Sequence, residues 1–292
     1  YYNIYNGLLS KHLPGGHVIK LINASGGIHP ALIRLAYLNG LTLSNDVSPR
    51  LANQILNSRW IQKHEFRYQI QGRLPSDNEF GLLREIGCVN EIRATLDIEY
   101  DGVLLLGAIL HRVRSRLAYL TDEYRHGLHF RRIFLLGSNR RLDKRKESPE
   151  FLLTPSELPF KSSWKIPNQL PLTEIDMMRL VAEQSDLPQE WEIVPISCPD
   201  VHTKTGIRHA NTGDTILWWQ KYTTSSRGHF LVASNQPFVQ YQKENARRLL
   251  PKEIILSGVG PAANPNLPIE VFLDNLTKQL YEEIMLEKCT VV

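Results

Sequence analysis

The sequence is poor in cysteine and contains no long apolar run. Cysteine occurs only at Cys88, Cys198 and Cys289, an odd number at wide spacing. These positions form no zinc-ligand pattern, and their scarcity predicts a reducing compartment, so we expect a cytoplasmic protein. Every apolar run is shorter than the roughly 18 residues that a membrane span needs, which excludes a transmembrane helix.

Charge of one sign is not in large excess either. The 292 residues include 34 Lys+Arg and 30 Asp+Glu, which gives a net charge of +4. This value gives no support to a nucleic-acid partner, and the composition excludes disordered, collagen-like and disulfide-scaffold classes. The length allows one large domain with an appendage, or two domains.

Familiar catalytic motifs are missing as well. The chain has no Gly-x-Ser-x-Gly elbow, no Walker loop, no His-Glu-x-x-His and no paired-cysteine zinc site, so we predict no metal site. Cys198 has His202 and His209 nearby and could be a nucleophile. A buried structural cysteine is the favoured interpretation, because nothing in the sequence indicates a lowered thiol pKa.

Helical signals fill residues 1–95. Pro30 and Gly40 bracket an apolar segment, Ser48-Pro49 opens a second helix, and the segment from Ser76 to Glu79 is a capping box before a third. These signals predict a small helical N-terminal region.

Short apolar runs alternate with amphipathic stretches from residue 96 to residue 288. The runs are 103–106, 133–136, 193–196, 230–233 and 254–256, and the stretches are about 111–127, 174–185, 212–222, 238–250 and 269–287. This alternation predicts an α/β fold, a Rossmann-like parallel sheet with helices on both faces. Pro195 predicts an edge position for its strand. Five prolines within 138–172 predict an insertion or flap over the sheet.

Polar and glycine-rich segments follow the predicted strands. The carboxyl ends of parallel strands share one edge of the sheet, where ligands of such folds bind. We therefore predict a site there for an anionic, nucleotide-like small molecule. Its ligand-binding residues are predicted to be Gly107, Arg112, Gly137, Ser138, Arg140, Arg141, Asn211, Thr212, Thr215, Ser234, Asn235 and Gln236.

Two acidic residues of this edge, Glu174 and Asp214, are the candidate catalytic groups, as a proton acceptor or as ligands of a cation beside phosphates. Helix capping explains several of these residues equally well. Thr173 with Asp176 has the spacing of a cap, and Thr212 stands at a predicted helix start. The reaction stays open, with a transferase and a hydrolase as the candidates.

A basic stretch follows the second strand. Arg140, Arg141, Lys144, Arg145 and Lys146 carry five positive charges against one negative charge from Asp143. A solvated face accounts for such a run, and recognition of a phosphate or carboxylate is the alternative.

The order of these segments resembles the SanA/YdcF/ElyC-like family of Rossmann-like bacterial proteins. The resemblance covers about residues 98–260 and rests on 100–107 with Arg116-Leu117, 133–137, 173–178, 211–215 and 231–237. It implies a Rossmann-like fold and a role in cell-envelope metabolism or small-molecule binding. Glu174 matches the family's acidic residue at a helix start, whereas Asp214 stands near the place of a Glu.

The chain ends in Cys289-Thr290-Val291-Val292, which has the C-a-a-X form of a prenylation signal at residues 289–292. This tail supports a second hypothesis: a bacterial effector delivered into a eukaryotic host and lipidated at Cys289. There the helical N-terminal region would bind a host protein, and the chain would associate with a host membrane.

Overall fold

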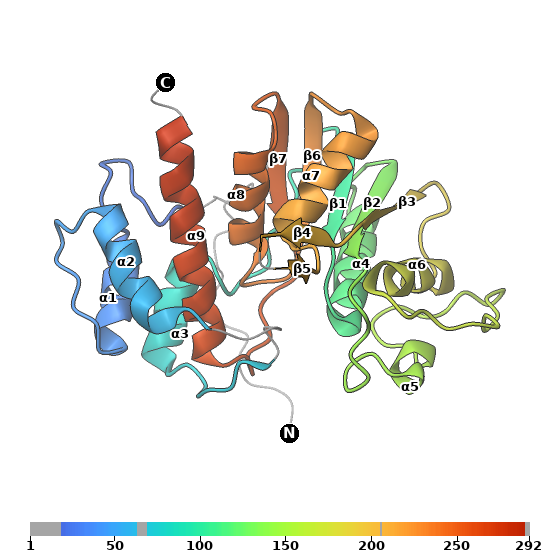
Figure 1. Ribbon diagram of the computed structural model, residues 1–292, viewed down its shortest axis with the longest axis horizontal. Helices are drawn as coiled ribbons and strands as arrows, with labels where there is room; N and C mark the ends of the chain where they lie inside the picture. Colours follow the sequence, from blue (N-terminus) through green and yellow to red (C-terminus); the bar gives the residue numbers. More distant parts are fainter. Residues whose placement is uncertain (1–18, 63–68, 205, 290–292) are drawn as a thin grey trace.

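A five-stranded parallel sheet forms the centre of the molecule (Figure 1). The computed structural model describes residues 19–62, 69–204 and 206–289. The strands are β1 (Gly102–Leu106), β2 (Arg132–Ser138), β3 (Glu192–Cys198), β6 (Gly228–Ala233) and β7 (Ile254–Val259), in the order β3-β2-β1-β6-β7. The predicted Rossmann-like sheet is confirmed.

Burial on both faces explains why these strands are continuous apolar runs. Every residue of β1 is buried, and successive side chains enter opposite layers. Val103 and Leu105 belong to one apolar cluster, and Leu104 and Leu106 to another. Pro195 lies in the edge strand β3, as predicted, where a missing backbone donor disrupts the ladder least.

Helices cover both faces of the sheet. The cluster around Val103 includes side chains of α4 (Leu110–Arg125) and α6 (Glu174–Gln184). The cluster around Leu104 includes side chains of α7 (Thr212–Thr223) and α8 (Val239–Leu249). All four helices start within two residues of the predicted bounds.

The strand order reverses between β1 and β6. The chain proceeds from β1 through β2 to β3 on one side, then crosses to β6 and β7 on the other. In open parallel sheets, ligands bind at such a switch point, outside the carboxyl ends of the strands. The topology therefore singles out the ends of β1 and β6.

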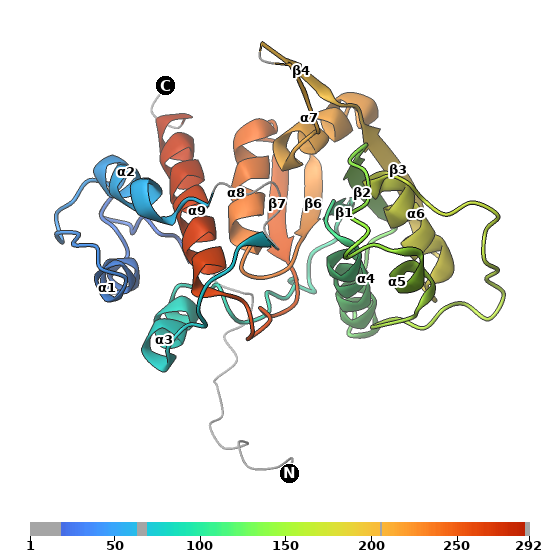
Figure 2. The same cartoon turned by 60° about the horizontal axis from the view of Figure 1, so that its bottom comes forward.

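The N-terminal region contains α1 (Pro30–Leu38), α2 (Pro49–Trp60) and α3 (Asp77–Glu85), as predicted. The capping box at the start of α3 is present. The apolar core of this region also includes side chains of α9 (Ile269–Cys289), and α9 packs against α8 on its other side (Figure 2). Thus α9 joins the helical region to the sheet.

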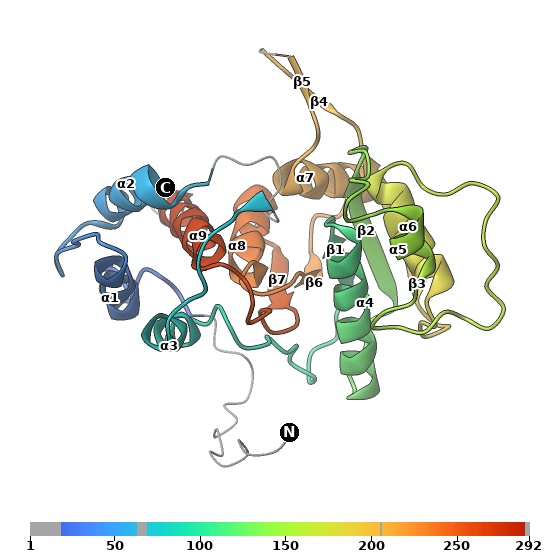
Figure 3. The same ribbon diagram turned by 90° about the horizontal axis from the view of Figure 1, so that it is seen from below.

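A short helix and a hairpin of two short strands have no counterpart in the sequence prediction. Helix α5 (Pro149–Leu153) lies inside the insertion 138–172, and β4 (Val201–Thr203) pairs with β5 (Gly206–Arg208) in an antiparallel hairpin that projects from the body (Figure 3). Buried Arg114 of α4 donates to the carbonyls of Leu152 and Thr154, 2.9 and 2.7 Å away. The insertion therefore packs beside α4 and α6, and residues 141–173 do not line the cavity at the carboxyl edge, which favours the insertion over the flap.

None of the described helices combines the length with the apolar character that a membrane span requires.

Candidate functional site

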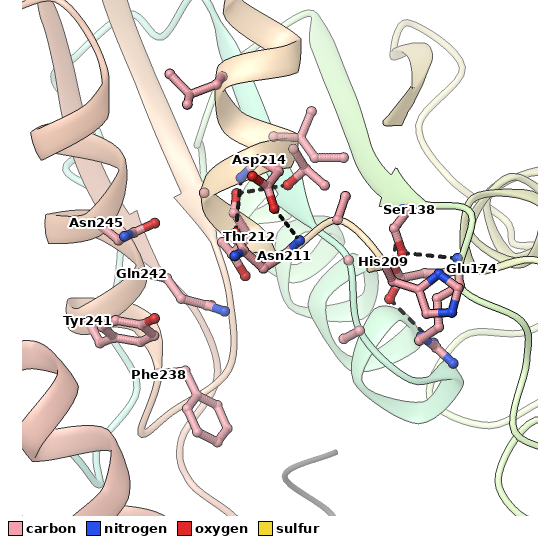
Figure 4. A pocket seen from close by; sticks show the side chains of 18 of the residues that line it. Ser138, Glu174, His209, Asn211, Thr212, Asp214, Phe238, Tyr241, Gln242 and Asn245 are labelled. Atoms are coloured by element: carbon pink, nitrogen blue, oxygen red, sulfur yellow. Dashed lines mark hydrogen bonds and ion pairs between the residues drawn. The ribbon is translucent and has the colours of Figure 1, made fainter. Parts of the chain in front are cut away.

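A cavity of about 900 Å³ opens at the carboxyl edge of the sheet, at the switch point (Figure 4). Its walls come from the ends of β1 and β2, the first turns of α4, α6 and α7, and from α8 and α9. Of the residues predicted to form the site, those that line the cavity are Gly107, Arg112, Ser138, Arg140, Glu174, Asn211, Thr212, Asp214 and Thr215. The cavity therefore opens at the edge of the sheet where the sequence predicts a site.

Five predicted ligand residues lie outside the lining. Gly137 is covered by Ile175, which can pack against the strand because glycine has no side chain. Arg141 is exposed and, like the rest of 141–173, contributes nothing to the cavity wall. Ser234, Asn235 and Gln236 are buried behind the wall, since their side chains bond to protein groups.

The turn after β1 supplies a cationic part of the site. Helix α4 begins after Ile109, which provides no side-chain cap. The Arg112 N–H donates to the Ile109 carbonyl at 3.0 Å, so the N–H groups of Leu110 and His111 are the ones left for another acceptor. Arg112, in the first turn of the helix, lies over the ring of Phe238 at 4.8 Å. The helix dipole and this guanidinium both favour an anion at this place.

Glu174 is the centre of a buried hydrogen-bonded cluster. Its Oε2 accepts from the amide and the hydroxyl of Ser138, at 3.0 and 2.7 Å, and its Oε1 accepts from Arg140 at 3.3 Å. A Cβ on Gly107 would lie 2.8 Å from Oε2, so glycine is needed there for the carboxylate to approach β1. Glu174 thus ties the start of α6 to the end of β2, close beside the end of β1.

Arg140 is neutralised from two sides. It donates to both carboxylate oxygens of Glu147, at 2.9 and 3.0 Å, and also bonds to Glu174. Burial alone would lower the pKa of Arg140, but the two carboxylates outweigh burial and raise it. The guanidinium is therefore a structural charge, and recognition of a ligand by the basic stretch stays a prediction.

Arg116 accounts for the buried residues that follow β6. This arginine is 2% exposed; it donates to Asn235 Oδ1 at 2.7 Å and to Ser234 Oγ at 3.3 Å, and also bonds to the carbonyl of Leu106. It therefore links the carboxyl ends of β1 and β6. Ser234 in turn donates to Gln242 Oε1, which orients that side chain in the cavity wall.

The start of α7 forms a capping box. Asn211 Oδ1 accepts from the amide of Asp214 at 3.1 Å, and Asp214 accepts from the amide of Asn211 at 2.8 Å. Arg208 adds two hydrogen bonds to the same carboxylate, at 2.6 and 3.2 Å. Burial acts to raise the pKa of Asp214, but these bonds outweigh it and lower the pKa below its ordinary value. Asp214 is thus an ionised cap.

A wall from α8 and α9 was absent from the sequence prediction. Phe238, Tyr241, Gln242 and Asn245 line the cavity at spacings of three and four, so they share one face of α8 (Figure 4). That spacing after a strand end is the signal that would have found them. From α9, Glu282 also lines the cavity and accepts from Arg248 and Asn245.

The charges around the cavity are mixed, with a cationic excess. Among the described lining residues, five arginines (Arg112, Arg116, Arg140, Arg208 and Arg248) face three carboxylates (Glu174, Asp214 and Glu282). Arg140 is neutralised by Glu147 as well as by Glu174, and Asn211 and Asp214 cap the start of α7. The remaining excess of guanidinium groups and the uncapped start of α4 suit a phosphate or carboxylate ligand. Within residues 19–62, 69–204 and 206–289, no three His, Cys, Asp or Glu side chains gather as metal ligands would.

The cysteines take no part in this cavity. Cys198 is buried, and burial raises the pKa of its thiol to about 11, which supports the structural interpretation. Cys289 ends α9, and residues 290–292 of the predicted prenylation signal lie outside the described residues.

No protein-family model matches the chain, and neither the curated proteins nor the solved structures include a significant match to it. The resemblance to the SanA/YdcF/ElyC-like family therefore stays a prediction.

Proposed function

We propose that the protein binds an anionic, nucleotide-like small molecule in the cavity at the carboxyl edge of the sheet. The observation that carries this proposal is the uncapped start of α4, which opens beside Arg112 on a cavity of about 900 Å³ at the switch point. That volume is in the range of small-molecule and cofactor sites.

The anionic part of the ligand is placed at α4 and not at α7. Asn211 and Asp214 already cap α7, and Asp214 neutralises Arg208. The first turn of α4 has no side-chain cap and carries Arg112. A phosphate at this turn would accept from the N–H groups of Leu110 and His111 and from the Arg112 guanidinium. The remainder of the ligand would extend past α7 toward α8.

If the protein is a transferase or a hydrolase, Glu174 is the proposed proton acceptor. It lines the cavity, and its Oε2 already accepts from the hydroxyl of Ser138, which lines the cavity beside it. The Glu174 carboxylate, 2.7 Å from the Ser138 hydroxyl, can accept the proton of that hydroxyl when the Ser138 oxygen attacks the ligand. Asp214 is less suited, because its oxygens are engaged by Arg208 and Asn211.

Replacing Arg112 by glutamine tests the anion site. We expect pyrophosphate and ADP to bind about tenfold more weakly at low salt, because one charge-assisted hydrogen bond is lost. The loss should shrink as salt is raised, since charges at a partly open site are screened over about 8–10 Å. Titration calorimetry over a salt series measures both effects.

Arg125→Gln is the matched control, because exposed Arg125 ends the same helix that Arg112 begins. It should leave both affinities unchanged. Equal affinities of Arg112→Gln and the parent at low salt would remove the start of α4 from the site. Failure of pyrophosphate and of every nucleotide to bind the parent would refute the proposed function.

The other hypothesis, an effector lipidated at Cys289 that binds a host protein and a host membrane, has no separate support in the fold. It stays a prediction, as does a cytoplasmic location. Mass spectrometry of the chain after incubation with a eukaryotic prenyltransferase would detect lipidation at Cys289.

A further inference from the structure

Two side chains of α8 present unused hydrogen-bonding groups to the cavity. Asn245 is 7% exposed, and its Oδ1 is buried without a hydrogen bond from any described residue. Gln242, 6% exposed, uses its Oε1 to accept from Ser234, while its Nε2 donates to none of the described residues. Figure 4 shows both side chains extending from α8 into the cavity. A buried acceptor without a partner is costly, so a ligand donor is expected at Asn245 Oδ1, and Gln242 Nε2 can donate to the same ligand.

The surrounding hydrogen bonds fix which end of each amide faces the cavity. Asn245 Nδ2 donates to Glu282 Oε1 at 2.8 Å. The Glu282 carboxylate also accepts a hydrogen bond from Arg248 and has no proton to donate, so the nitrogen of Asn245 must face it. The Ser234 hydroxyl accepts from Arg116 and so gives its own proton to Gln242 Oε1. Asn245 therefore offers an acceptor, and Gln242 offers a donor.

The order of these groups along α8 gives them a direction. Phe238, which Arg112 overlies, precedes Gln242 by one turn and Asn245 by about two turns. Distance from the proposed anion site therefore increases from Gln242 to Asn245. A ligand anchored by phosphate at α4 meets the donor first and the acceptor farther away.

Apolar side chains border the same part of the cavity. Leu217 of α7 is 42% exposed although it lines the cavity, and Leu249 and the ring of Tyr241 line it too. Such side chains cover the faces of a planar ring, while the two amides read its edge.

We propose that this wall is a subsite for a nucleobase with an exocyclic amine, as adenine and cytosine have. The amine lies at the end of the base far from the phosphates and donates to Asn245 Oδ1, and a ring nitrogen without a proton accepts from Gln242 Nε2. A base with an exocyclic oxygen at that end, such as hypoxanthine or uracil, places an acceptor against an acceptor. This proposal rests on the proposed function and adds the class of base.

The test compares ADP with IDP on the full chain by titration calorimetry. The two nucleotides differ at the exocyclic group and the adjacent ring nitrogen and share the diphosphate. We expect ADP to bind about ten- to hundredfold tighter than IDP, because IDP leaves the Asn245 acceptor unpaired. CDP should exceed UDP for the same reason. These comparisons need no variant and so do not depend on how a substitution folds.

Asn245→Ala should then lower the affinity for ADP to that for IDP and leave the affinity for pyrophosphate unchanged. Glu282 keeps its hydrogen bonds from Arg248 in this variant. The matched control is Gln240→Ala, which changes an equally buried amide of α8 that bonds to Glu244 outside the cavity lining, and it should keep the preference for ADP.

Equal binding of ADP and IDP to the parent would overturn the base subsite and leave the anion site standing. An ADP preference that Asn245→Ala does not alter would also overturn it. If pyrophosphate, ADP and IDP all fail to bind, the proposed function and the subsite fall together.

Discussion

Arg140→Gln is expected to lower the free energy of unfolding by about 3–5 kcal/mol, since removal of one partner leaves buried charges without compensation. In the folded chain the guanidinium bonds to two buried carboxylates, those of Glu147 and Glu174. Glutamine is too short and has no charge, so neither carboxylate can be neutralised. Denaturant unfolding monitored by circular dichroism measures the change.

The neighbouring residue provides the control. Arg141 is exposed, and Arg141→Gln should change the free energy of unfolding by no more than about 0.5 kcal/mol. A pair of variants with equal, small effects would contradict the structural assignment of Arg140. Such a result would indicate that both arginines belong to a solvated basic face.

Gly260→Ala is expected to destabilise the protein by about 3 kcal/mol, at the upper end of the cost of overpacking. An added Cβ would lie 1.9 Å from the carbonyl oxygen of Ser234 and 3.0 Å from Val239 Cγ2. Because the clash involves backbone, the ends of β6 and β7 must move apart. The bond from Arg116 to Ser234 would be disturbed with them.

Gly81→Ala is the opposite case and serves as the control. Gly81 lies within α3, and an added Cβ would have no atom within 4 Å. Alanine should raise the free energy of unfolding by about 0.5–1 kcal/mol, because it loses less conformational entropy in a helix. Equal effects at Gly81 and Gly260 in thermal and denaturant unfolding would show that the close approach at Gly260 is absent.

Much of the fold was predictable from the sequence because the sheet is buried on both faces. A strand such as β1, with no exposed residue, must be apolar throughout, and such runs separated by amphipathic stretches have few other interpretations. Pro195 marked the edge strand through its missing donor. The hairpin β4–β5 was missed, since its short, exposed strands have no buried face to impose a pattern.

The sequence predicted residues of the cavity lining only where their position follows from adjacent elements of the chain, such as a strand end or a helix start. The segments after β1 and before α7 reach the cavity because a strand end and a helix start put them there. Ser234 and Asn235 occupy an equivalent position, but Arg116, distant in sequence, binds their side chains. No local pattern indicates that partnership.

Arg140 and Arg141 make the same point with adjacent residues. Their sequence context is almost the same, but Arg140 is buried because it pairs with Glu147 and Glu174. The wall of α8 was unpredictable in a similar way. Which face of that helix meets the cavity depends on how α9 packs against it, and Asn245 is oriented by Glu282 of α9.

The position of α9 has a consequence for how the chain folds during its synthesis. The core around Leu32, Leu56 and Leu83 is completed by Phe272 and Leu276 of α9. At 5–20 residues per second, the ribosome adds α9 roughly ten to thirty-five seconds after the end of the N-terminal region. Until then the apolar side chains of this core that pack against α9, chiefly those of α2, have no native cover. The nascent chain must therefore carry them exposed, or shielded by a chaperone, while the whole sheet is being made.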